Sequence, residues 1–98
     1  MRAAMLLAPA VAMSTQVLAQ DVSEDIAAGR RIADQWCSTC HKSGGLAPTF
    51  SEVANLPSTT APSLKVFLQT SHEKTPNFQL TQSEANAVVA YILSLKGK

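Results

Sequence analysis

Two cysteines and a histidine lie within five residues, in the stretch CSTCH from Cys37 to His41. This spacing matches Cys-x-x-Cys-His, the signature of covalent haem attachment. Two thiols three residues apart can each add to one of the two vinyl groups of a haem. The adjoining His41 then faces the iron and binds it through an imidazole nitrogen. We therefore predict one covalently bound haem c, attached at Cys37 and Cys40, with His41 as the proximal iron ligand.

Other kinds of site also use a pair of cysteines at this spacing. A redox dithiol of the thioredoxin type needs a strand–helix–strand setting, and no such pattern surrounds Cys37. A structural zinc site needs four ligands, whereas the chain offers two cysteines and two histidines without the usual zinc spacing. A disulfide between Cys37 and Cys40 would tether only a small loop. The motif therefore favours haem over these alternatives.

The loop after the motif offers a partner for His41. It reads KSGGLAP, and Gly44, Gly45 and Pro48 interrupt regular structure there. An imidazole that binds a metal through one nitrogen usually donates a hydrogen bond from the other nitrogen, often to a backbone carbonyl. Because this loop must fold back over His41, we predict that the carbonyl oxygen of Pro48 accepts that hydrogen bond.

The first nineteen residues have the features of a secretory signal peptide. An arginine precedes an apolar stretch over residues 3–13, and Val17 and Ala19 suit the two small-residue positions before a cleavage site. The apolar stretch is too short and too interrupted to span a bilayer as a stable helix. A retained N-terminal anchor is the alternative. We predict that residues 1–19 are cleaved off and that residues 20–98 form one domain without a transmembrane segment.

The predicted mature chain has no net charge, because its seven basic residues equal its seven acidic ones. No basic block and no alternation of basic with aromatic residues is present, which argues against nucleic acid as a partner. All three methionines, Met1, Met5 and Met13, lie in the predicted signal peptide. A domain this short buries little apolar surface by itself. A haem at its centre would therefore supply much of the core.

Hydrophobic periodicity predicts an all-α fold, in which no run of residues forms a strand pair. The clearest helix is expected over residues 81–96, where Thr81 and Glu84 form a capping box before an apolar stripe. Another long helix is expected over residues 23–37, with Ser23 as its N-cap.

Two shorter helices are expected between the long ones. The first covers residues 50–54. The second covers residues 62–70, has a proline in its first turn, and carries Leu64, Phe67 and Leu68 on its apolar side.

These segments together resemble a small bacterial class I cytochrome c over essentially the whole mature chain. The resemblance rests on GRRIADQWCSTCH, APTF, SLKVFLQTSH, PNFQLT and VVAYILSLK, which occur in the order of that family. It implies a cytochrome c fold, in which the N- and C-terminal helices cross near a glycine and an aromatic residue around one attached haem. Gly29 and Tyr91 fit those two positions.

The chain departs from that family at the distal side of the haem. Many relatives read His-x-x-Met-Pro-Asn, and the methionine sulfur binds the iron, but this chain has Thr75 at the methionine position. The distal site can then be open or hold water, or His72 can bind the iron. Lys74 or Asn77 can bind instead, or the ligand comes from elsewhere in the chain. Loss of the soft sulfur ligand should lower the reduction potential.

The resemblance implies single-electron transfer between periplasmic redox proteins, such as a dehydrogenase, an oxidase or another cytochrome. We therefore expect an exported, monomeric carrier that resides in the periplasm. Lys42, Lys65 and Lys74 can surround the haem edge and steer encounters with acidic partners, or they can be ordinary solvated lysines.

The missing methionine raises an alternative function, the binding or sensing of small ligands such as CO, NO or O2 at an open distal site. A peroxidase would need an acid–base group poised over the iron, and only His72 can serve as one. We therefore expect that the protein is not an enzyme.

Overall fold

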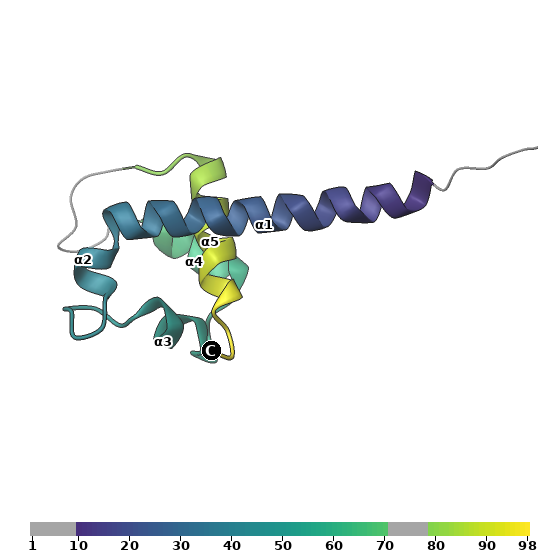
Figure 1. The fold of residues 1–98 in the computed structure, drawn as a ribbon. Coiled ribbons are helices and arrows are strands. Elements are labelled where there is room, and N and C mark those ends of the chain that lie inside the picture. The colour runs from purple at the N-terminus through teal and green to yellow at the C-terminus, as the bar shows by residue number, and fades with distance from the viewer. Residues whose placement is uncertain (1–9, 71–78) are drawn as a thin grey trace, which may run out of the picture.

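The computed structural model describes residues 10–70 and 79–98, with side chains from Asp21 onward. These residues form helices and no strands, in agreement with the predicted all-α fold. Figure 1 shows a long N-terminal helix crossed by the C-terminal helix, with shorter helices to one side. The helices are α1 Ala10–Trp36, α2 Ser38–His41, α3 Phe50–Ala54, α4 Ala61–Gln69 and α5 Gln82–Ser94.

Helix α1 begins thirteen residues earlier than predicted, at Ala10 instead of Ser23. The prediction that Ser23 caps this helix is therefore wrong, because Ser23 lies inside it and is exposed. No proline or glycine occurs between Ala10 and Gly29, so nothing in the backbone interrupts the helix there. A serine does not mark the beginning of a helix when the residues before it also favour helical structure.

Each of the three helices after the motif loop, α3, α4 and α5, begins with a capping box. The predicted pair of Thr81 and Glu84 is present at α5: the Glu84 amide donates to Thr81 Oγ1, and the Thr81 amide donates to Glu84 Oε1. Thr49 caps α3 and Thr60 caps α4 in the same way. Side chains thus satisfy the backbone N–H groups that every helix start leaves unpaired.

Gly29 allows α1 and α5 to cross in close contact. A Cβ atom at this position would overlap the carbonyl group of Ala87 and would lie 2.9 Å from the Cβ of Tyr91. Only hydrogen at Gly29 permits this approach of the two backbones. The predicted roles of Gly29 and Tyr91 at the helix crossing are therefore confirmed.

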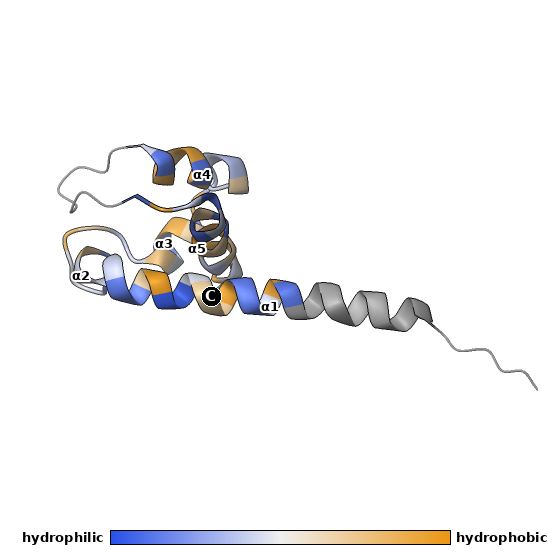
Figure 2. Ribbon diagram, turned by 90° about the horizontal axis from the view of Figure 1, so that it is seen from above, coloured by the Kyte–Doolittle hydropathy of each residue, from blue (hydrophilic) through white to orange (hydrophobic). Residues whose placement is uncertain are grey.

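Helix α5 packs against α1, α3 and α4 and is the centre of the small core. The core cluster consists of Ala54 from α3, Leu64 from α4, and Val88, Val89 and Ile92 from α5. Figure 2 shows hydrophobic and hydrophilic residues alternating along α4 and along the coloured part of α1, as expected for helices with one buried face.

Phe67 does not join this core, although its spacing from Leu64 predicts that it should. Leu64 is buried and Leu68 is half-buried, whereas Phe67 is 60% exposed. Leu64 and Leu68 are four residues apart and share the face toward α5. Phe67 lies on an adjacent face, and a different partner must cover it if it is to be buried.

Candidate functional site

One helical turn at the end of α1 brings the two thiols and the imidazole together. The Cys37 amide donates to the carbonyl of Ala33 at 2.9 Å, so the chain is still helical where the motif begins. The amides of Cys40 and His41 then donate to the carbonyl of Cys37, at 3.3 and 3.0 Å. This turn forms α2 and places all three motif side chains within one turn.

Both cysteines are free thiols and half-buried. Burial raises the pKa of the Cys37 thiol, because the charged thiolate loses hydration. Cys37 therefore remains protonated at neutral pH in this conformation.

The motif loop folds back over His41 as its sequence predicts. The amide of Gly45 donates to the carbonyl of Lys42, and that of Ala47 donates to the carbonyl of Cys40, both at 2.9 Å. Gly44 adopts φ +77°, a left-handed conformation that glycine tolerates best. The loop is thereby held closed and brings Pro48 alongside His41.

His41 Nδ1 lies 2.6 Å from the carbonyl oxygen of Pro48. A carbonyl oxygen can only accept a hydrogen bond, so Nδ1 carries the proton and donates it. In the neutral imidazole the lone pair then lies on Nε2. Nε2 is therefore the nitrogen through which His41 would bind a metal, and the hydrogen bond holds the ring in that tautomer.

The side chain of Phe50 is a neighbour of His41 that the sequence did not indicate. The two rings are stacked, with centroids 4.5 Å apart and planes inclined by 18°. Phe50 also meets the ring of Tyr91 edge-on, at 6.3 Å and 87°. An open hollow of about 320 Å³ adjoins this cluster and is lined in part by His41, Phe50 and Tyr91. His41 and Phe50 are nine positions apart and lie on different helices, so no helical spacing reveals the contact.

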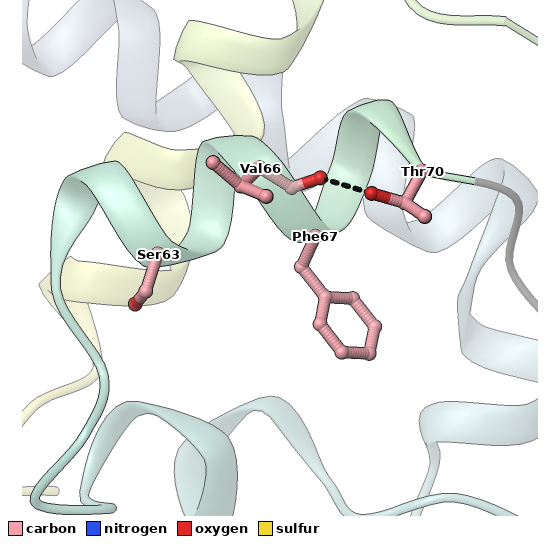
Figure 3. A pocket seen from close by; sticks show the side chains of 4 residues that line it. All are labelled: Ser63, Val66, Phe67 and Thr70. Carbon is pink, nitrogen blue, oxygen red and sulfur yellow. Dashed lines mark hydrogen bonds between the residues drawn. The ribbon is translucent and has the colours of Figure 1, made fainter.

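Apolar side chains remain uncovered near the motif and on α4. Leu46 in the motif loop is 87% exposed, and Val66 and Phe67 on α4 are 65% and 60% exposed. Val66 and Phe67 line an open hollow of about 410 Å³ together with Ser63 and Thr70, and Phe67 projects into it (Figure 3). Exposed aromatic and branched residues of this size are costly in water.

These residues fit a haem c. Two thiols on one turn can form the thioether bonds, and the imidazole on the same turn can bind the iron. The exposed apolar side chains can cover a flat hydrophobic ring. Cys37 and Cys40 would hold the group covalently, and His41 would bind its iron. Such a haem, when bound, supplies one-electron chemistry by cycling between ferric and ferrous iron.

The residues considered for the distal side lie outside the described residues. These are His72, Lys74, Thr75 and Asn77. Of the lysines predicted near the haem edge, Lys42 directly follows α2 and is exposed, and Lys65 lies on α4 and is half-buried.

The C-terminal residues are fastened to α3, another contact that the sequence did not indicate. The amide of Gly97 donates to Asn55 Oδ1 at 2.8 Å, and Ser51 Oγ donates to the carbonyl of Lys98 at 2.6 Å. Asn55 Nδ2 also donates to the carbonyl of Ser51 at 2.7 Å. The chain that follows α5 is thereby tied to the helix that begins with Phe50.

The described residues lack the features of two other kinds of site. No helix there has the length and hydrophobicity needed to cross a membrane. The same residues contain no cluster of three or more His, Cys, Asp or Glu side chains arranged to hold a metal ion.

Comparisons with known proteins agree with this site. The family model described as "Cytochrome C oxidase, cbb3-type, subunit III" matches residues 24–92. Cytochrome c-552 of Bradyrhizobium diazoefficiens is 33% identical over 103 residues, which cover 98% of this chain and 95% of that protein. No solved structure matches significantly. With its helical fold, its Cys-x-x-Cys-His turn and these similarities over nearly its whole length, the chain belongs to the small class I c-type cytochromes, a family of haem electron carriers.

Proposed function

We propose that this protein is an exported monohaem cytochrome that carries single electrons between periplasmic redox proteins. One observation carries the proposal: the imidazole of His41, on the same turn as both thiols, is held by the carbonyl of Pro48 at 2.6 Å in the tautomer that a metal ligand needs. Cys37 and Cys40 attach the haem, and His41 is the proximal ligand.

The family suggests the kind of partner. Its model is described as a subunit of a cbb3-type cytochrome c oxidase, and the relative is named a cytochrome. A periplasmic oxidase or dehydrogenase, or another cytochrome, is therefore the partner class that we propose. A monomeric carrier needs only brief docking, and a mature chain without net charge is compatible with partners of either sign.

Export is the second part of the proposal. Cleavage after Ala19 would remove residues 1–19 and leave α1 with residues 20–36, which still include Gly29 and the whole crossing with α5. The folded domain therefore does not depend on the segment that we propose is removed. The thiols would meet haem in the periplasm, the compartment to which the signal peptide directs the chain.

The experiment is expression with the cytochrome c maturation machinery, followed by fractionation. We expect the mature chain in the periplasm, its mass reduced by residues 1–19 and increased by one haem that survives denaturing electrophoresis. The Cys37→Ser/Cys40→Ser double variant should lose the covalent haem, while Ser38→Ala, which changes the same turn but keeps both thiols, should retain it. A wild-type chain without bound haem would refute the proposal.

A second function is favoured by the position of the methionines. All three lie within the first thirteen residues, so a mature chain that begins at Gln20 has no sulfur ligand of this kind for the iron. We propose as an alternative that the distal site is open and binds CO, NO or O2. Addition of CO to the ferrous protein tests it: a changed visible spectrum supports the open site, and an unchanged one rejects it.

A further inference from the structure

Phe50 covers one face of the His41 imidazole. Their centroids are 4.5 Å apart and their planes differ by 18°, so the rings lie nearly parallel. Offset parallel stacking at such a distance is a favourable arrangement for aromatic rings. The contact is made by a half-buried phenylalanine at the first position of α3, directly after the loop that closes over the histidine.

Phe50 is itself held from two directions. The Thr49 amide donates to Glu52 Oε1 at 2.8 Å and the Glu52 amide donates to Thr49 Oγ1 at 3.2 Å, which fixes the backbone on which Phe50 begins α3. The ring of Tyr91, on α5, meets Phe50 edge-on at 6.3 Å. A ring that is anchored in this way can restrain its neighbour instead of following it.

The hydrogen bond from His41 Nδ1 to Pro48 does not by itself fix the plane of the imidazole. A single hydrogen bond fixes the direction of one N–H group, but the ring can still turn about that direction. A parallel ring at 4.5 Å opposes that turn, because rotation would drive the edge of the imidazole into Phe50. The two contacts together restrain both the direction and the plane of the ring.

We propose that Phe50 is a positioning residue that sets the plane of the His41 imidazole, and that Tyr91 links this plane to α5. The inference rests on the proposed function, since it takes His41 as the proximal ligand of a haem. The orientation of an axial imidazole affects the electronic structure of the iron, and ligand orientation is one of the means by which a protein tunes a metal centre. Phe50 acts through its contact with His41.

The experiment compares ferric holoprotein variants by electron paramagnetic resonance and by redox titration. Phe50→Leu removes the ring, and we expect changed g values and a shifted reduction potential. Phe50→Tyr keeps a ring of the same shape and should preserve both. Val53→Ala is the matched control: it removes packing from the same helix, where Val53 contacts the core cluster, and should lower stability without altering g values or potential.

A measurement on the unaltered protein covers the case in which Phe50→Leu fails to fold. In the ferrous, low-spin holoprotein, with CO added if it is needed to reach that state, nuclear Overhauser effects should connect the ring protons of Phe50 with those of His41. Their absence would overturn the proposal. It would also be overturned if Phe50→Leu kept the wild-type g values and potential, or if Val53→Ala changed them equally. Failure of the wild type to bind haem would instead refute the proposed function.

Discussion

At the scale of single residues, the geometry around His41 depends on a tightly closed loop, in which a side chain at Gly45 would not fit. The amide of Ala47 donates to the carbonyl of Cys40, which closes the loop and carries Pro48 toward the imidazole. A Cβ atom at Gly45 would overlap that same carbonyl and would lie 3.0 Å from the carbonyl oxygen of Lys42. The absence of a side chain at Gly45 is thus a condition for the hydrogen bond of the histidine.

Gly45→Ala should therefore disturb the proximal side of the haem. We expect displacement of the loop, a weaker His41–Pro48 hydrogen bond and a changed reduction potential, measured by redox titration of the holoprotein. Gly44→Ala is the control, because its Cβ meets no atom within 4 Å and its positive φ costs only about 1–2 kcal/mol of stability. Equal potentials in the two variants would contradict the expected role of Gly45.

At the scale of the elements, the crossing of α1 and α5 determines whether Gly29→Ala stabilises or destabilises the protein. Helix propensity predicts that Gly29→Ala stabilises α1 by about 1 kcal/mol. The overlap with the Ala87 carbonyl predicts instead a loss of about 1–3 kcal/mol, the usual cost of forcing extra volume into a packed contact. We expect the loss to dominate, since backbone atoms cannot move aside as a flexible side chain can.

Chemical denaturation of the holoprotein measures this difference. Ala27→Gly, at an exposed position of the same helix, is the control and should cost about 1 kcal/mol through helix propensity alone. A Gly29→Ala protein that is more stable than the wild type would show that the two helices do not approach as closely as described.

The attachment of the C-terminal residues to α3 gives a second prediction for the elements. Asn55→Ala removes the hydrogen bonds to Gly97 and to Ser51, and because the site is exposed we expect a loss of about 1 kcal/mol in the free energy of unfolding. Asn86→Ala, on the exposed side of α5, should be neutral or slightly stabilising. Thermal unfolding of both variants checks this, and equal midpoints would contradict it.

At the scale of the whole molecule, the described residues by themselves leave several large apolar side chains exposed. The buried cluster is small and joins α3, α4 and α5, while Leu46, Val66 and Phe67 remain largely exposed. A group that covers these side chains removes apolar surface from water in the folded state and so stabilises that state relative to the unfolded chain. Haem attachment and folding should therefore be strongly coupled.

The haem-free Cys37→Ser/Cys40→Ser protein should accordingly be much less stable than the holoprotein. We expect a difference of more than about 3 kcal/mol, since fully covering a valine or phenylalanine side chain contributes about 1.5–3 kcal/mol and both Val66 and Phe67 are largely exposed on α4. Thermal unfolding by circular dichroism and binding of a hydrophobic dye measure it. Ser38→Ala with haem attached is the control. A haem-free protein that unfolds at the wild-type temperature would contradict this coupling.

Features that depend on near neighbours in the chain could be predicted from the amino-acid sequence. Cys37, Cys40 and His41 lie on one turn because their spacing spans only five residues, and Thr81 caps α5 because Glu84 is three residues away. Gly29 could be assigned to the helix crossing through its resemblance to a family position. For such features, local geometry leaves few arrangements open.

Contacts between residues far apart in the chain could not be predicted, because they depend on how the helices pack. The stacking of Phe50 on His41 depends on the path of a loop, and the bond between Asn55 and Gly97 joins residues 42 positions apart. The outward direction of Phe67 depends on which face of α4 meets α5. Hydrophobic spacing shows that a residue is apolar and shares a helix face, but the packing of all helices around α5 determines which face is covered.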